Sequence, residues 1–387
     1  MATINIANKM TRVPFNVPPV TGRELEYIGE VINRREFSGN GTFTARCQIW
    51  LKERLNAVDA ILTHSCTAAL EMAAILSELE PGDEVIMPSF TFVSTANAVV
   101  LRRAVPVFVD IRPDTLNIDE TRIEAAITPR TKAICVVHYA GVCAEMDTIR
   151  QIAAKHKLIL IEDAAQALLS TYRGTPAGHL GDLACFSFHE TKNVTTGEGG
   201  ALAINNPRFS ERAYIIWEKG TNRRAHKLGA VEKYSWVDYG SSFLPSEFMA
   251  AILLAQLEQI ERITEERRAI WRRYHNGFAD LEAAEIVQRP SVPAHCTHNG
   301  HLYYLLLRNQ KERDRLIQSL GVEEIGAPFH YVPLHSSLAG LRYARTHGDL
   351  SVTDNASAGL IRLPLHAGMA ASAADRVIDS IHAILKR

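Results

Sequence analysis

The chain has 387 residues, long enough for two or three structural units with a cleft between them. Apolar residues make up 47% and charged residues 22%, which indicates a globular protein. The 42 basic and 43 acidic side chains nearly cancel, which argues against a nucleic-acid partner. The apolar stretches are shorter than the roughly 18 residues of a membrane-spanning helix, and the N-terminal residues lack a secretory signal. We therefore expect a cytoplasmic protein without a membrane partner.

From residue 59 onward, short apolar runs alternate with amphipathic stretches, a rhythm typical of βαβ units. Residues 67–79 and 147–157 have the helical period of crossover helices covering a mostly parallel sheet. The runs that predict strands are residues 60–63, 84–88, 105–110, 133–138, 158–163, 184–188 and 201–204.

Residues 245–278 have helical periodicity throughout, with Pro245 near the start and Ser246 as a cap. They predict one long helix that leaves the sheet. A strand at 301–309, a helix at 313–321 and a closing helix at 375–387 follow. We therefore expect a large α/β domain over residues 1–250, and a long linking helix with a smaller α+β domain over 251–387.

The six cysteines form no CxxC pair and no Cys/His spacing typical of zinc sites. We expect neither a disulfide framework nor a metal site. The fingerprints of dinucleotide-binding and P-loop proteins are missing as well.

Lys192 follows a predicted strand and precedes the glycines Gly197, Gly199 and Gly200. An isolated lysine is usually a solvated surface group, but sites in open α/β sheets lie at the carboxyl ends of strands. Glycines there let the backbone approach a ligand closely. Lys192 is therefore a candidate Schiff-base lysine, whose amine must be neutral to attack an aldehyde.

Asp163 ends the apolar segment KLILIED, where an acid either caps the next helix or meets a cation. Together with Lys192 and Gln166 it is positioned like the parts that hold pyridoxal phosphate (PLP), in which a carboxylate pairs with the protonated pyridine nitrogen. On a helix beginning at Asp163, Gln166 lies one turn further on and reaches the phenolic oxygen of the ring.

Ser65, Cys66 and Thr67 join a predicted strand to a helix. Such residues are common helix caps, and a helix N-terminus with free amides also binds phosphate. Phe92 follows another strand end, where an aromatic side chain either belongs to the core or stacks on a flat cofactor ring.

From about Pro14 to the C-terminus, the chain resembles the DegT/DnrJ/EryC1/StrS family of PLP-dependent sugar aminotransferases, which have the aspartate-aminotransferase fold of type I. The segments that carry the resemblance are GDEVIMPSFTFVSTANAV, LIEDAAQA, FSFHETKN with GEGGA, and HYVPLH. The resemblance implies Lys192 as the Schiff-base lysine, Asp163 at the pyridine nitrogen, Gln166 near the phenolic oxygen, Phe92 stacked on the ring, and Cys66, Thr67 and Ser187 at the phosphate.

Members of this family are homodimers whose partner chain completes each site, often through an Asn just before the long helix. This chain has GSSFLPSE at that place, and Ser242 is the best match to the Asn. The resemblance also implies Lys219 and Tyr331 as contacts to a nucleotide sugar, beside the simpler interpretation that each is a surface or packing residue.

Further segments, such as RPDTLNIDET and YSWVDYGSSFLPSE, are most similar to family members that form dTDP-4-amino-4,6-dideoxy-D-galactose. The resemblance therefore implies transfer of the amino group of L-glutamate to dTDP-4-dehydro-6-deoxy-D-glucose, for a cell-surface polysaccharide of the enterobacterial common antigen type. The alternatives are the gluco product, another nucleotide-sugar aminotransferase, and a non-catalytic regulator. A 3-dehydrase of this fold carries His in place of Lys192.

Overall fold

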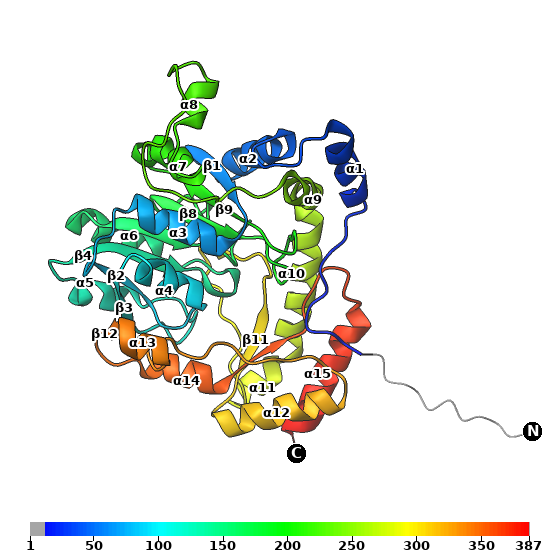
Figure 1. Cartoon of the computed structure of the whole chain (residues 1–387). Coiled ribbons are helices and arrows are strands. Elements are labelled where there is room, and N and C mark those ends of the chain that lie inside the picture. Colours follow the sequence, from blue (N-terminus) through cyan, green and yellow to red (C-terminus); the bar gives the residue numbers. More distant parts are fainter. Residues whose placement is uncertain (1–11, 387) are drawn as a thin grey trace, which may run out of the picture.

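The computed structural model describes residues 12–386, and its centre is an eight-stranded sheet with the order β1-β9-β8-β5-β4-β2-β3-β12 (Figure 1). All strands except β9 run in the same direction, since β9 pairs antiparallel with both β1 and β8. The predicted, mostly parallel sheet is thereby confirmed. Its strands are β1 Asp59–Thr63, β2 Glu84–Pro88, β3 Val105–Val109, β4 Thr131–Val137, β5 Ile159–Asp163, β8 Leu183–Ser187, β9 Gly200–Ile204 and β12 Arg345–Thr346.

Helices cover both faces of this sheet, because alternate residues of the buried strands point to opposite sides. In β4, for example, Ile134 and Val136 join one core and Ala133 and Cys135 the other. The first core packs against α1 Glu24–Arg34, α2 Thr42–Leu55, α5 Ile123–Ala126, α6 Met146–His156 and α9 Glu247–Leu257, and the second against α3 Cys66–Leu76, α4 Val93–Val100 and α7 Ser210–Trp217.

The single long helix expected over 245–278 was wrong, because the chain forms two helices, α9 and α10 Ile260–Gly277. The break lies at Glu258 and Gln259, and Gln259 has φ −116°, outside the helical region. α9 is apolar on nearly all sides and is buried against the sheet domain, whereas α10 has one apolar face. The chain changes direction at the point where these two packing environments meet.

The C-terminal part has its own core around a two-stranded antiparallel sheet, in which β11 Tyr303–Leu306 pairs with β13 Leu360–Leu363. Two segments cross the predicted division at residue 250: Val13 belongs to this core, and β12 pairs with β3 in the large sheet. The remaining helices are α8 Arg223–Lys227, α11 Ala279–Ala283, α12 Gln310–Val322, α13 Leu338–Tyr343, α14 Ser351–Gly359 and α15 Ala371–Leu385.

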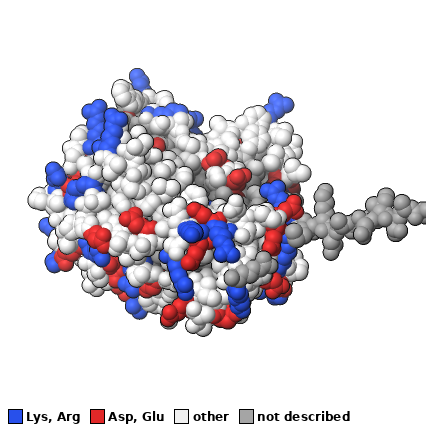
Figure 2. Space-filling model, turned by 90° about the horizontal axis from the view of Figure 1, so that it is seen from below, with Lys and Arg blue, Asp and Glu red and all other residues white. Residues whose placement is uncertain are grey.

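A third, small sheet consists of β10 Cys296–Thr297, β6 Thr171–Tyr172 and β7 Thr175–Pro176. Within residues 12–386, none of the helices combines the length and the hydropathy needed to cross a membrane. Lys and Arg side chains alternate with Asp and Glu over the face shown in Figure 2, as the near-zero net charge leads one to expect.

Candidate active site

A cavity of about 590 Å³ lies at the carboxyl ends of β1, β2, β4, β5 and β8, between the sheet and the C-terminal part. This is the place where open α/β sheets bind their ligands. It brings together most of the residues that the sequence singled out. These are Cys66, Thr67, Phe92, Asp163, Gln166, Ser187, Lys192 and Tyr331.

The N-terminus of α3 forms one end of this cavity. Ser65 caps the helix, its Oγ accepting a hydrogen bond from Ala68 N at 3.1 Å. Among the described residues, nothing accepts a hydrogen bond from the N–H groups of Cys66 and Thr67. Free amides at a helix N-terminus bind anions such as phosphate. The capping and phosphate interpretations are therefore compatible, since different atoms serve them.

Gly200 at the start of β9 allows this arrangement. A Cβ atom at residue 200 would collide with both Cys66 N and the carbonyl carbon of Ser65. Thr67 Oγ1 and Ser94 Oγ lie 2.8 Å apart and add two hydroxyl groups to the same end of the cavity. The glycine therefore lets the backbone of β9 lie close to the N-terminus of α3, whose free amides face the cavity.

Asp163 lies at the end of β5 and is buried. Its Oδ2 accepts a hydrogen bond from Thr95 Oγ1 at 2.7 Å, and its Oδ1 accepts one from Ala165 N at 3.2 Å. Burial raises the pKa of Asp163, while the two hydrogen bonds and the nearby Lys192 and His138 oppose this effect. No ion pair to Asp163 is formed within residues 12–386, so a cation supplied by a ligand would find a prepared partner.

No helix begins at Asp163, and that part of the prediction was wrong. The strand pairing continues at Ala164, whose N–H donates to Cys185 O, and the residues after it form turns instead of a helix. The carbonyl oxygens of Gln166 and Leu168 accept hydrogen bonds from Asn299 Nδ2 at 2.8 and 2.9 Å. These side-chain contacts take the place of the helical hydrogen bonds.

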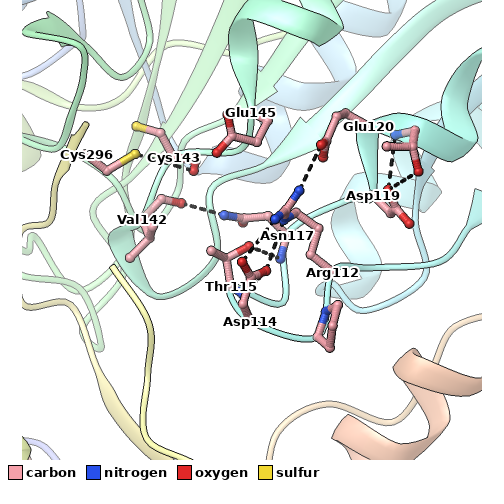
Figure 3. Close-up of polar contacts among 12 residues, drawn as sticks. Arg112, Asp114, Thr115, Asn117, Asp119, Glu120, Val142, Cys143, Glu145 and Cys296 are labelled. Atoms are coloured by element: carbon pink, nitrogen blue, oxygen red, sulfur yellow. Dashed lines mark hydrogen bonds and ion pairs between the residues drawn. The ribbon is translucent and has the colours of Figure 1, made fainter. Parts of the chain in front are cut away.

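Gln166 nevertheless reaches the cavity. Its Oε1 accepts a hydrogen bond from Ala140 N at 2.7 Å, and its Nε2 donates to Tyr331 Oη at 3.1 Å. The side chain thus connects the turn after β4 with the C-terminal part. Asn117 holds that turn, since its Oδ1 accepts a hydrogen bond from Tyr139 N at 2.8 Å. Its Nδ2 donates to Val142 O at 3.0 Å (Figure 3).

Lys192 follows β8 and is partly buried in the cavity wall. Burial lowers the pKa of its amine and the Arg362 cation lowers it further, whereas Cys66 and Asp163 act in the opposite direction. Asn193, the next residue, holds the backbone beside Lys192 in place. Its Nδ2 donates to Asn299 O at 3.0 Å, and its Oδ1 is hydrogen-bonded to His301 Nδ1 at 3.0 Å. A lowered pKa increases the neutral fraction of the amine, which is the form that attacks an aldehyde.

Phe92 and Ser187 border the cavity from two strand ends. Phe92 immediately precedes α4 and has 58% of its surface exposed in the single chain, so its ring is available to a ligand. Ser187 ends β8, close to Lys192 in sequence. Their roles at the cofactor ring and at the phosphate stay predictions.

Ser242 and Lys219 lie outside the cavity. Ser242 forms an isolated antiparallel bridge with Glu218, and Lys219 N donates to Ser241 O at 3.0 Å. They flank the segment that carries α8 away from the body of the molecule (Figure 1). A role for either residue in the cavity of a partner chain, or at a nucleotide sugar, stays a prediction.

The N-terminal segment closes another side of the cavity, with Phe15 and Asn16 in its wall. Val13 is bonded to the C-terminal part through Val13 N to Glu324 O at 3.0 Å, and Leu365 N donates to Phe15 O at 3.2 Å. Asn16 Nδ2 donates to Glu190 O, near Lys192, at 3.0 Å. The wall thus depends on contacts between the two ends of the chain.

The sequence analysis missed several residues that shape this site. Thr95, Asn117 and His301 are polar and buried, but their partners are far away in the sequence. Arg362 stands out in retrospect as the only charged residue in the apolar run GLIRLPL, on β13. A charge in such a run was the signal that could have identified it.

The parts of the cavity fit one cofactor. Lys192 offers an amine for an aldehyde, Asp163 an unpaired carboxylate for a pyridine nitrogen, and the α3 N-terminus free amides for a phosphate. Together with the parallel sheet and the smaller C-terminal part, they define a PLP-dependent enzyme of fold type I.

The comparisons with known proteins then identify the family. Residues 19–382 match the DegT/DnrJ/EryC1/StrS aminotransferase family, and the chain belongs to it. A relative, the GDP-perosamine synthase of Caulobacter vibrioides, is 33% identical over 387 residues, which cover 97% of this chain and 99% of that protein. The spore coat polysaccharide biosynthesis protein SpsC of Bacillus subtilis is 31% identical, with 97% of each chain covered.

Solved structures agree with this assignment. The PLP form of the sugar aminotransferase Spr1654 from Streptococcus pneumoniae, described as putative, has a TM-score of 0.89 at 26% identity, covering 97% of this chain and 99% of that chain. The aminotransferase TlmJ from Streptoalloteichus hindustanus has a TM-score of 0.87 at 29% identity, with the same shares covered. The predicted fold class and cofactor are thereby confirmed.

Proposed function

We propose that this aminotransferase moves the amino group of L-glutamate to C4 of dTDP-4-dehydro-6-deoxy-D-glucose. The products are dTDP-4-amino-4,6-dideoxy-D-galactose and 2-oxoglutarate, and the enzyme acts as a cytoplasmic homodimer in the synthesis of a cell-surface polysaccharide. The observation that carries the proposed chemistry is the meeting of Lys192, Asp163 and the α3 N-terminus in one cavity of a chain from this family. The proposed sugar substrate rests on segments such as RPDTLNIDET and YSWVDYGSSFLPSE, which are similar to those of family members that form this product.

Bound PLP supplies an electron sink that acidifies the Cα–H bond of an amino acid. Lys192 would hold the cofactor through its amine, and the same amine, when free and neutral, would accept the proton from Cα and return it on the other side of the reaction. Asp163 would keep a proton on the pyridine nitrogen, because a buried carboxylate stabilises a cation beside it. Phe92 would cover a face of the ring, and Gln166 would donate to the phenolic oxygen.

The phosphate end is held by groups that carry no charge of their own. In the proposed site, the N–H groups of Cys66 and Thr67 and the hydroxyl groups of Thr67 and Ser187 donate hydrogen bonds to it. Tyr331 and Lys219 are proposed contacts of the nucleotide sugar, and Ser242 is proposed to act in the partner's site.

A GDP-linked keto sugar is the second candidate acceptor, since the GDP-perosamine synthase of Caulobacter vibrioides is a relative along the whole chain. To separate the two, purified holoenzyme and L-glutamate are incubated with each nucleotide sugar, and the product is analysed by NMR. An axial 4-amine on the dTDP sugar supports the galacto product, and an equatorial one the gluco alternative. Turnover of the GDP sugar alone contradicts the proposed nucleotide.

The covalent chemistry is tested by borohydride reduction followed by peptide mass mapping. The cofactor adduct is expected on Lys192, and Lys192→Ala is expected to lose both the adduct and the visible absorbance band. A colourless wild-type protein that binds no PLP would support the regulator instead, and an adduct on another residue would contradict the assignment of Lys192.

A further inference from the structure

Thr95 lies in the first turn of α4, and its side chain is buried beside Asp163. Its Oγ1 donates a hydrogen bond to Asp163 Oδ2 at 2.7 Å. Phe92, which borders the cavity, lies three residues earlier in the chain, and Thr95 N donates to Phe92 O at 3.3 Å. The segment that offers an aromatic ring to a ligand therefore also holds the buried carboxylate.

A second buried threonine fixes the direction of this hydrogen bond. Thr91 Oγ1 lies 3.0 Å from Thr95 Oγ1, and both residues are buried. An ionised carboxylate only accepts hydrogen bonds, so the single hydroxyl proton of Thr95 is used for Asp163. Thr91 must then donate to Thr95. The three side chains form one ordered row, in which each hydroxyl group has a fixed role.

Other buried carboxylates of the large sheet receive more hydrogen bonds than Asp163 does. Asp110, directly after β3, accepts four, and one of the donors is the hydroxyl group of Thr353 at 2.8 Å. Glu162 in β5 accepts three from backbone N–H groups alone. Asp163 accepts two within residues 12–386, from Thr95 and Ala165. A carboxylate has about four acceptor positions, so Asp163 keeps room for a donor from a ligand.

The hydroxyl group of Thr95 also supports the charge of Asp163. Burial raises the pKa of Asp163, and the hydrogen bond from Thr95 is the strongest of the effects that oppose this rise. Loss of the hydroxyl group would favour the neutral acid, which cannot pair with a protonated nitrogen. It would also free Asp163 Oδ2 from the contact that orients it.

We infer that Thr95 is a positioning residue for the cofactor: its hydroxyl group holds the Asp163 carboxylate in the orientation and charge state that a protonated pyridine nitrogen requires. The inference rests on the proposed function, in which Asp163 pairs with that nitrogen. Thr95 acts through Asp163 and needs no contact of its own with cofactor or substrate. We therefore expect Thr95 to affect the binding of a ring that carries this nitrogen, and not of a ring that lacks it.

The test compares two ligands that differ at one ring atom. PLP and 1-deaza-PLP, in which a C–H group replaces the pyridine nitrogen, are titrated separately into the full-length apoprotein, and absorbance gives each dissociation constant. Wild type is expected to bind PLP about 30-fold more tightly than the analogue, because only PLP offers a cation to Asp163. In Thr95→Val this preference is expected to fall to about threefold or less.

Three further variants make the assignment specific. Thr95→Ser keeps the hydroxyl group, and its preference is expected to stay within about threefold of wild type. Thr353→Val is the matched control, because Thr353 also donates to a buried aspartate but lies outside the cavity. It is expected to lower the free energy of unfolding in urea and to leave the preference unchanged. Asp163→Asn is expected to abolish the preference, and adding Thr95→Val to it should change the preference no further.

The outcomes separate this inference from the proposed function. Equal weakening of both ligands by Thr95→Val, or a preference equal to that of wild type, overturns the role of Thr95. A wild type without any preference overturns the pairing of Asp163 as well, and with it that part of the proposed function. If Thr95→Val does not fold, Thr95→Cys decides by the same comparison, because a thiol occupies the site but donates only weakly. A wild-type preference in Thr95→Cys then contradicts the inference.

Discussion

Asp163 illustrates how a single buried carboxylate depends on what binds beside it. Its hydrogen bonds with Thr95 and Ala165 hold it in place, but burial disfavours its charge until a cation arrives. The pyridine nitrogen is that cation in the proposed site. The residue is therefore arranged for the cofactor rather than for the stability of the empty fold.

Asp163→Asn is expected to keep the fold and lower turnover by about 100-fold or more, because a neutral amide cannot hold the proton on the pyridine nitrogen. Circular dichroism and PLP content check the fold, and steady-state kinetics check the loss. Turnover at the wild-type rate would refute the assignment of Asp163.

Lys192 leads to a prediction about pH. Because the pKa of its amine is lowered, the neutral fraction near pH 8 exceeds that of an ordinary lysine, and the rate of PLP incorporation into apoprotein should rise with pH to a plateau reached below pH 10.5. Arg362→Gln removes a neighbouring cation, so we expect the profile to move to higher pH. Absorbance after rapid mixing with PLP measures both profiles, and a shift in the opposite direction would contradict the influence of Arg362.

At the scale of elements, the junction between β9 and α3 is the most demanding contact of the site. A side chain at Gly200 would meet backbone atoms that cannot move aside without displacing the helix N-terminus. Gly200→Ala is expected to destabilise the protein by about 1–3 kcal/mol and to weaken PLP binding. Urea unfolding and PLP titration measure the two effects. Gly29→Ala, in α1 with open space around it, is the control and should leave PLP binding unchanged.

The sequence patterns predicted the elements correctly where burial produces a regular pattern of apolar residues. Each predicted strand of the large sheet exists, because a strand covered on both faces reads as a short apolar run. The break at Gln259 escaped prediction, since helix periodicity continues on both sides of it. The turn after Asp163 escaped for a different reason: Asn299, far along the chain, bonds the carbonyl oxygens that a helix would use.

At the scale of the whole molecule, local sequence patterns again predicted only part of the site. The residues at strand ends could be predicted, because the carboxyl ends of parallel strands gather at one edge. The charge in the run GLIRLPL marks Arg362 as unusual, but its place in the cavity wall beside His301 could not be predicted, because periodicity does not tell which face the C-terminal part turns toward the sheet. Lys219 and Ser242 lie outside the cavity of one chain, so their roles depend on the proposed dimer.

The proposal that two subunits share each site can be tested by mixing subunits. Lys192→Ala and Ser242→Asp proteins, each inactive by expectation, are unfolded and refolded together. If Ser242 acts in the partner's cavity, each heterodimer regains one intact site, and about a quarter of wild-type activity should return by random pairing. Mixing Lys192→Ala with Asp163→Asn is the control and should restore nothing, since both residues border the same chain's cavity. An unrescued Ser242 mixture would place that residue elsewhere.

The bonds that join Phe15 to Leu365 and Val13 to residues near 325 have a consequence for biogenesis. During translation Val13 and Phe15 leave the ribosome hundreds of residues before their partners do. The pocket therefore stays unfinished until almost the entire polypeptide has emerged. We therefore expect vitamin B6 to be loaded only after most of the polypeptide has been made, and newly made protein to be colourless until then.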